Sequence, residues 1–347
     1  MLSHLRSLLL ALLLLGISGC GTLYLAQAAG GQYRVLHARR PIEKVVADPR
    51  TPAPLRARLE DVRSARDFAV AELHLPDNRS YRTYADIKRR YVVWNVVATP
   101  EFSVEPERWC FPIAGCVAYR GYFKEKTART FAKSLATKGF DVMVGGVPAY
   151  STLGKFADPV LSSMMRYGTN ELAAIIFHEL AHQLLYVKND TEFNEAFATV
   201  VEDTGLERWL EARGRSDEMQ DFLTENARER EFIDLFAGGR EQLERLYASG
   251  VAKPEMRERK AAILADITAQ ARDLQHRQGD QFYESWLQEG LNNAHLASVA
   301  TYYQCVPGFE RLLAEQGGDL ERFYAAARAL AKESRAERHA LLCQVRR

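Results

Sequence analysis

The feature that most constrains this chain is the motif His178-Glu179-Leu180-Ala181-His182, which lies in a segment, residues 170–185, that reads as one helix. Side chains at positions i and i+4 lie on the same face of a helix. His178 and His182 can therefore offer two imidazole nitrogens to one metal ion. Glu179 lies about 100° around the helix, where a general base can take a proton from water without being a ligand. Zinc suits this donor set, because it accepts nitrogen and carboxylate ligands and keeps a position open for water at catalytic sites.

The rest of this helix favours a metal site over the alternative, a surface helix with two spare histidines. Glu171 and Tyr186 share the side of the helix that carries both histidines. The other side is a broad apolar arc formed by Ala173, Ile176, Phe177, Leu180, Ala181 and Leu184. A helix buried on one side, with its ligands gathered on the other, fits a buried zinc site.

The segment after the motif predicts a second helix that faces the first. The first helix should end near Val187, followed by a turn at 188–190, with Thr191 as the N-cap and a helix over 192–202. On this second helix the apolar stripe consists of Phe193, Ala196, Phe197, Val200 and Val201. A short hairpin would bring its other side against the metal-binding helix.

Acidic side chains on that other side supply candidates for a third ligand. Glu195 is the best candidate, and Glu202 can hydrogen-bond the free ring nitrogen of a ligand histidine. Asp190, Glu192 and Asp203 remain rivals, and the alternative is that all of these acids are solvated helix charges.

Two segments, His178–Gln183 and Phe193–Ala198, together resemble the gluzincin peptidases, whose glutamate ligand comes from an Asn-Glu segment on the next helix. More closely, the mature chain resembles the bacterial predicted zinc-aminopeptidase lipoproteins. That resemblance includes Gly146–Gly154, Asp158-Pro159 and Asn292–Ala294. It implies a zinc-dependent aminopeptidase that acts on peptides, with a zincin-like α+β fold. Metzincins are excluded, because they require Gly and His where this chain has Leu185 and Lys188.

The same resemblance leaves three alternatives open. The interval from His182 to Glu195 is shorter than in the well-studied aminopeptidases, and no acid lies within 145–154, where their amino-terminus recognition motif would fall. The site could therefore serve an endopeptidase or another amide hydrolase. A non-catalytic envelope lipoprotein that binds zinc only structurally is the third possibility. An intact Glu179 argues against it, since a structural site has no use for a general base.

The N-terminus predicts export and a lipid anchor. Residues 1–19 read as a signal peptide whose apolar run, Leu8–Leu15, is too short to span a bilayer. The segment Ile17–Cys20 resembles a bacterial lipobox, which predicts lipid attachment at Cys20 and a tether over 20–31. The alternative is ordinary secretion. By resemblance to Gram-negative sorting, Gly21 favours the periplasmic face of the outer membrane.

The four remaining cysteines are Cys110, Cys116, Cys305 and Cys343, which allow three pairings. We expect Cys110–Cys116 and Cys305–Cys343, with reduced thiols as the alternative. Without residues 1–19, basic and acidic residues are equal in number, so the composition offers no case for nucleic-acid binding.

The chain should form one metallopeptidase domain over 32–347, with an α/β lobe at 32–168 and a helical lobe at 169–347. The sequence predicts an α+β fold with a small twisted sheet and a mostly helical C-terminal half. Gly238-Gly239 and 249–254 should interrupt a charged helical stretch there. Predicted elements of the first lobe are helices at 41–68, broken at 51–54, and at 126–138, and strands at 91–98, 116–123 and 141–144.

Three further site elements are expected. Val142–Tyr150 is a candidate edge strand that pairs with the substrate backbone. Tyr302, Tyr303 and Tyr150 are candidate donors to the oxyanion that forms during hydrolysis. Glu171 is a candidate anchor for the ammonium group of an aminopeptidase substrate, which needs a fixed negative partner.

Overall fold

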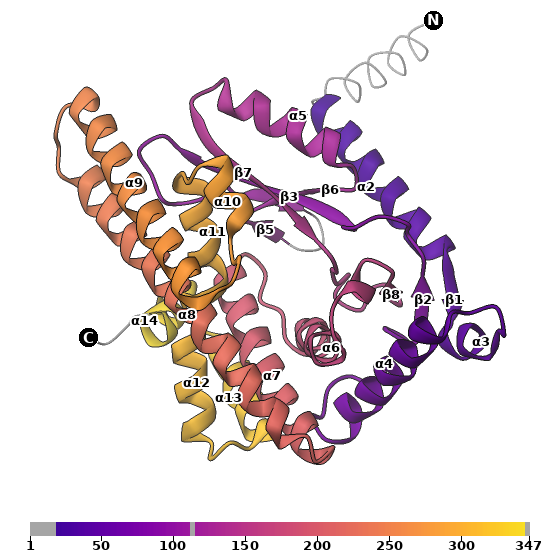
Figure 1. Ribbon diagram of the computed structural model, residues 1–347. Helices are drawn as coiled ribbons and strands as arrows, with labels where there is room; N and C mark the ends of the chain where they lie inside the picture. Colours follow the sequence, from indigo (N-terminus) through magenta and orange to yellow (C-terminus); the bar gives the residue numbers. More distant parts are fainter. Residues whose placement is uncertain (1–18, 112–114, 344–347) are drawn as a thin grey trace, which may run out of the picture.

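The structure, a computed structural model, describes residues 19–111 and 115–343, without the side chains of 19–23 and 300–302. Nearly all of the predicted signal peptide and the side chain of Cys20 therefore lie outside the described residues. The α+β class, with small sheets and a mostly helical C-terminal half, is confirmed (Figure 1). No helix in the described part is both long and apolar enough to cross a membrane.

The central sheet has the strand order β6-β3-β7 and is antiparallel. It consists of β3 (Val93–Pro100), β6 (Arg120–Tyr122) and β7 (Phe140–Val147). Because side chains alternate between the two faces of a strand, neighbouring residues of β3 meet different helices. Val96 packs towards α5 (Glu125–Ala136), whereas Val97 packs towards Ala294 of α11 (Asn293–Tyr303). The sheet is thus covered by α5 on one face and by α11 on the other (Figure 1).

The strand predicted at 116–123 is divided into two, which corrects the sequence prediction. Its first part, β5 (Gly115–Val117), pairs with β4 (Trp109–Phe111) so that Cys110 faces Cys116, and these residues form a disulfide. Its second part, β6, pairs instead with β3. The second predicted disulfide, Cys305–Cys343, is also present. Both expected pairings are therefore confirmed.

The segment predicted as a tether is helical and packs onto the sheet. Residues 20–31 belong to α2 (Gly19–His37). The ring of Tyr24 packs edge-on against Tyr122, and the Arg120 guanidinium lies 4.1 Å from the Tyr24 ring centroid. Gly31 lacks a side chain where the Phe123 ring approaches. The small residues of α2 therefore allow this helix to pack closely against the sheet.

A second small sheet, of order β1-β2-β8, and two helices complete the N-terminal half. The helical region predicted at 41–68 is confirmed with its break, because α3 ends at Ala47 and α4 begins at Ala53, with Pro52 as its N-cap and Pro54 in its first turn. The elements are β1 (Arg39–Pro41), α3 (Ile42–Ala47), α4 (Ala53–Ala71), β2 (Thr83–Ala85), β8 (Val160–Leu161) and the short η1 (Met164–Arg166).

The C-terminal half is helical from Thr169 onward. The predicted break at Gly238-Gly239 is wrong, because α8 runs through it without interruption. At Gly239 a side chain would collide with Ile267 of α9, so the glycine permits close helix packing. The helices are α6 (Thr169–Leu184), α7 (Thr191–Ala212), α8 (Ser216–Ala248), α9 (Lys253–Gln278), α10 (Glu284–Glu289), α11, α12 (Val306–Glu315), α13 (Leu320–Leu330) and α14 (Arg335–Leu342).

Candidate metal centre

Helix α6 carries both histidines on its less buried side. Phe177 and Leu180 are fully buried, as the apolar arc predicts, while the His178 side chain is 19% exposed and that of His182 9%. The helix ends at Leu184 rather than near Val187, and the chain is extended at Leu185. The motif therefore occupies the last two turns of α6, next to the turn that leads into α7.

That turn is fixed by side chains that bind the backbone. Asp190, not the predicted Thr191, is the N-cap of α7, and its carboxylate accepts a hydrogen bond from the Phe193 amide. Asn194 clamps the turn by accepting from the Val187 amide at 2.7 Å and donating to the Val187 carbonyl at 2.8 Å. Since both contacts come from the first turn of α7, they set the position of that helix relative to the end of α6.

Small residues let α7 approach α6 closely. Ala198 is fully buried, and a side chain at Gly205 would come within 2.9 Å of the Phe177 ring. This close packing carries Glu195 over the histidines of α6. The predicted apolar stripe of α7 is buried as expected, in the same cluster of apolar side chains as α6.

His178, His182 and Glu195 converge on one point. One Glu195 oxygen lies 3.4 Å from His178 Nε2 and 3.6 Å from His182 Nε2, and the three donor atoms lie within 4.8 Å of one another. Two ligands bound at 2.0–2.1 Å to a tetrahedral zinc lie about 3.3–3.4 Å apart. The two imidazoles and the carboxylate therefore fit a divalent metal ion such as zinc in type and spacing.

Glu202 lies behind His178, as the sequence predicts. Its carboxylate is 2.8 Å from His178 Nδ1, the ring nitrogen that faces away from Glu195. Burial opposes protonation of His178, but the carboxylates of Glu195 and Glu202 outweigh it and raise the pKa of His178 well above its usual range. For Glu195, burial is outweighed by His182 and His178, which lower its pKa to about 2. These charges favour a cation between the two helices.

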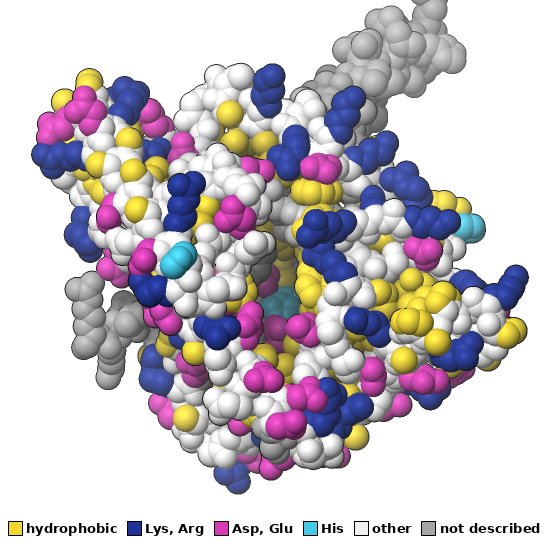
Figure 2. Space-filling model, in the orientation of Figure 1, with side chains coloured by type: hydrophobic (Ala, Val, Ile, Leu, Met, Phe, Trp, Pro, Cys, Tyr) yellow, Lys and Arg dark blue, Asp and Glu magenta, His cyan; other side chains and the backbone are white. Residues whose placement is uncertain are grey.

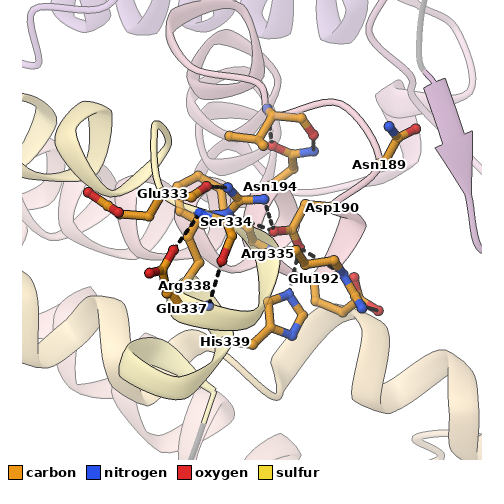
Figure 3. Close-up of polar contacts among 12 residues, drawn as sticks. Asn189, Asp190, Glu192, Asn194, Glu333, Ser334, Arg335, Glu337, Arg338 and His339 are labelled. Carbon is orange, nitrogen blue, oxygen red and sulfur yellow. Dashed lines mark hydrogen bonds and ion pairs between the residues drawn. The ribbon is translucent and has the colours of Figure 1, made fainter.

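Two of the rival ligands are engaged elsewhere. Asp190 is bound by Arg338 and His339 of α14, and Glu192 by Arg335 and Arg108 (Figure 3). Asp190, Glu192 and His339 also lie close enough together to hold a metal ion. However, the arginines already neutralise both carboxylates, so this cluster acts as an ionic contact between α14 and α7.

Glu179 is buried beside the donor cluster, but it is not one of its members. Burial raises the pKa of Glu179 to about 7, partly offset by His182 and His178. The charges of Tyr81 and Asp158 interact with it as well. The sequence assigned a role to neither residue, although Asp158 belongs to a segment on which the family resemblance rests.

The loop that precedes β8 contacts α6, the helix that carries Glu179, through the Gln183 side chain. Asp158 is buried and accepts hydrogen bonds from the Thr152 amide and hydroxyl, at 2.9 and 2.8 Å. Burial raises the pKa of Asp158 to about 6. Gly154 lies against the Gln183 side chain of α6. This loop belongs to the segment on which the family resemblance rests.

The predicted oxyanion donors lie in different surroundings. Tyr150 donates a short hydrogen bond to Gln32, and Tyr303 donates to Glu229 at 3.3 Å, while the Tyr302 side chain is outside the described residues. Tyr186 lies beside the donor cluster, with its ring centroid 6.4 Å from that of His182. Burial and the charge of Glu195 raise the pKa of Tyr186 to about 12. Its place on the histidine side of the motif was the sequence signal for it.

Glu171 is exposed in the first turn of α6. It lies seven residues before His178, which corresponds to about 10 Å along the helix axis. Figure 2 shows a hollow in this face of the molecule, with histidine at its floor and acidic side chains along its lower rim. The His178 side chain is 19% exposed, so the donor cluster is reachable from solvent.

Comparison with known proteins agrees with this arrangement at the level of the family. No curated protein and no solved structure matched the chain. A family model described as "Putative aminopeptidase" matches residues 23–342, which is nearly the whole described chain. The chain belongs to this aminopeptidase family.

Proposed function

We propose that this protein is a zinc metallopeptidase that removes residues from the free amino end of peptides. The observation that carries the proposal is the convergence of His178, His182 and Glu195 at the spacing of tetrahedral zinc ligands, with Glu179 beside them. A purely structural site would not need this second carboxylate, which is not one of the ligands. Membership of the aminopeptidase family supports the choice of peptides as substrates.

Each residue then has a distinct task. His178, His182 and Glu195 would hold the metal, and Glu202 would orient the His178 ring through Nδ1. Bound zinc would polarise the scissile carbonyl and acidify water. Glu179 would take a proton from the attacking water and pass it to the leaving amine. Tyr186, beside His182, joins Tyr150, Tyr302 and Tyr303 as a candidate donor to the developing oxyanion.

The acidic surroundings support a substrate with a free ammonium group. Glu229 accepts hydrogen bonds from Tyr283 and Tyr303, and burial together with the charge of Glu202 raises its pKa. Among the described residues, Glu229 forms no ion pair with a lysine or arginine. A cationic peptide terminus would supply the missing counter-charge, so Glu229 joins Glu171 as a candidate anchor.

The edge of the central sheet supports backbone recognition. β7 is the last strand in the order β6-β3-β7, so one of its edges does not pair within the described sheet. An extended peptide can add to such an edge through main-chain hydrogen bonds. We assign this role to the segment Val142–Tyr150, which ends at the loop beside Glu179.

The location is proposed from the N-terminus alone. The lipobox-like segment Ile17–Cys20 would place the mature protein on a membrane through lipid at Cys20, and Gly21 favours the periplasmic face of the outer membrane. An oxidising compartment agrees with the two disulfides.

The test is a metal analysis of the purified full chain combined with a peptide-library digest, on the native protein and on Glu179→Gln. We expect about one zinc per chain in both proteins, and release of N-terminal residues only by the native one. Cleavage of blocked internal peptides at equal efficiency would replace the aminopeptidase by an endopeptidase. Zinc without any hydrolysis would favour the non-catalytic scaffold.

A further inference from the structure

The charge of this chain is unevenly distributed, although its total is close to zero. Residues 20–168 contain 23 lysines and arginines against 14 aspartates and glutamates, whereas residues 169–347 contain 22 against 31. The first part therefore carries a net charge of +9 and the second part −9. Such an asymmetry indicates a partner for one side of the molecule that the overall composition conceals.

Part of the basic excess forms a stripe on α5. Its inner side is buried through Ala128 and Ala132. On the outer side, Lys126, Thr130, Lys133 and Thr137 are exposed at helical spacing, flanked by the exposed Lys124 and Lys138. The acid of this helix, Glu125, is neutralised by Arg129. None of the four lysines forms an ion pair with another described residue.

An uncharged stripe on α2 lies next to it. Tyr24 packs in the same apolar cluster as Phe131 and Leu135 of α5, so α2 begins beside α5 (Figure 1). Four of its exposed residues, Leu25, Ala26, Ala29 and Tyr33, share one helix face, and Arg34 and His37 are exposed as well. Leu25 is 51% exposed and Tyr33 is 65% exposed, which makes them two of the most exposed large apolar side chains described.

The helices that carry the two stripes are neighbours at the start of α2, near the N-terminal end of the described chain. Cys20, the predicted site of lipid attachment, lies in the first turn of α2. An apolar helix face combined with lysines is the pattern that binds the surface of an anionic bilayer. The apolar side chains are buried at the boundary of the acyl chains, and the lysines are attracted by the anionic headgroups. We propose that the α2–α5 face rests on a membrane that contains anionic phospholipid.

This orientation leaves the metal centre free. α5 covers the face of the sheet to which Val96 points, whereas α11, which packs on Val97, covers the opposite face. α11 in turn packs against α7, the helix that carries Glu195. The acidic, catalytic half is thus held away from an anionic surface that would repel it.

Lysine acetylation measured by mass spectrometry tests the contact on the full chain. The chain is incubated with vesicles of phosphatidylcholine, alone or mixed with phosphatidylglycerol. We expect acetylation of Lys126 and Lys133 to be about fivefold slower on the anionic vesicles than on the neutral ones. Attraction of about 1 kcal/mol between each lysine and the anionic surface corresponds to this factor. Lys332, in the acidic half, should react equally on both. About 1 M salt should abolish the difference, because it screens charges beyond about 3 Å.

A pair of matched variants distinguishes binding through the α2–α5 face from a general attraction of the protein to anionic vesicles. Lys126→Glu combined with Lys133→Glu should make the remaining Lys124 as reactive on anionic vesicles as on neutral ones. Arg272→Glu combined with Lys332→Glu changes the charge equally in the acidic half and should leave Lys124 protected. Equal reactivity of Lys126 and Lys133 on both kinds of vesicle would overturn the proposal, and so would equal loss of protection in both variants.

Discussion

Replacing Asp190 by Asn should destabilise the protein by breaking the contact between α14 and α7. The Asp190 side chain is fully buried, and Arg338, which is 6% exposed, approaches it at 2.7 Å (Figure 3). His339 Nε2 lies 2.7 Å from the other carboxylate oxygen. Asparagine caps a helix about as well as aspartate, so the variant removes the charge while it keeps the N-cap.

The expected cost follows from the charge that is left unpaired. Breaking a buried ion pair by removing one partner costs about 3–5 kcal/mol. The lower end applies here, because Arg338 keeps its hydrogen bond to the Glu333 carbonyl. At about 2.1 cal/mol/K per residue for the entropy of unfolding, about 3 kcal/mol lowers the Tm of this chain by roughly 4–5 °C.

The pH dependence has a definite sign. Burial would raise the pKa of Asp190, but His339 and Arg338 outweigh it and lower the pKa. A carboxylate with a lowered native pKa stabilises the fold above its unfolded value, about 3.9, and loses this contribution as the pH falls through the native value. The difference in the free energy of unfolding between the native protein and Asp190→Asn should therefore be constant above about pH 5 and shrink below about pH 4.

The assay is chemical and thermal unfolding of the native protein and Asp190→Asn across this pH range. Asp77→Asn is the matched control, because Asp77 pairs with Arg82 at a similar distance, 2.9 Å, but on the surface. Exposed pairs contribute at most about 1 kcal/mol. A loss for Asp190→Asn no larger than that of the control would refute the buried-pair reasoning.

The remaining predictions concern the metal, the anchor and the substrate. Glu195→Ala should lower zinc affinity sharply in a chelator competition, because one of three protein ligands is lost, and Glu202→Gln should lower it about 10–100-fold; unchanged affinity in the first variant would place the third ligand elsewhere. Cys20→Ala should abolish incorporation of labelled palmitate and leave an unprocessed precursor, and normal incorporation would contradict the lipobox. Glu229→Gln and Glu171→Gln should be compared by kcat/KM on matched free and acetylated peptides. The variant of the true anchor should slow only the free peptide, whereas a structural role would slow both.

Local patterns predicted much of this protein correctly. The i, i+4 spacing of His178 and His182 and the apolar arc beneath them defined one helix and its buried side. The apolar stripe around Glu195 predicted the second helix and the side of it that faces the histidines. Helical periodicity acts within a few residues, so it is readable without knowledge of the fold. The same holds for the strand that became β3 and for the short disulfide hairpin.

Tertiary structure decided what joins distant parts of the chain. The charge of Glu179 interacts with Tyr81 and Asp158, and α14 reaches Asp190 across 148 residues. Residues 20–31 belong to a helix, and Phe123 occupies the space where a side chain at Gly31 would lie. Gly239 lies inside α8, and Ile267 occupies the corresponding space there. Such contacts leave no periodic trace in the sequence, since burial and pairing depend on the position of the whole chain. Sequence alone therefore predicted which residues gather at the centre, and only packing determined what surrounds and supports them.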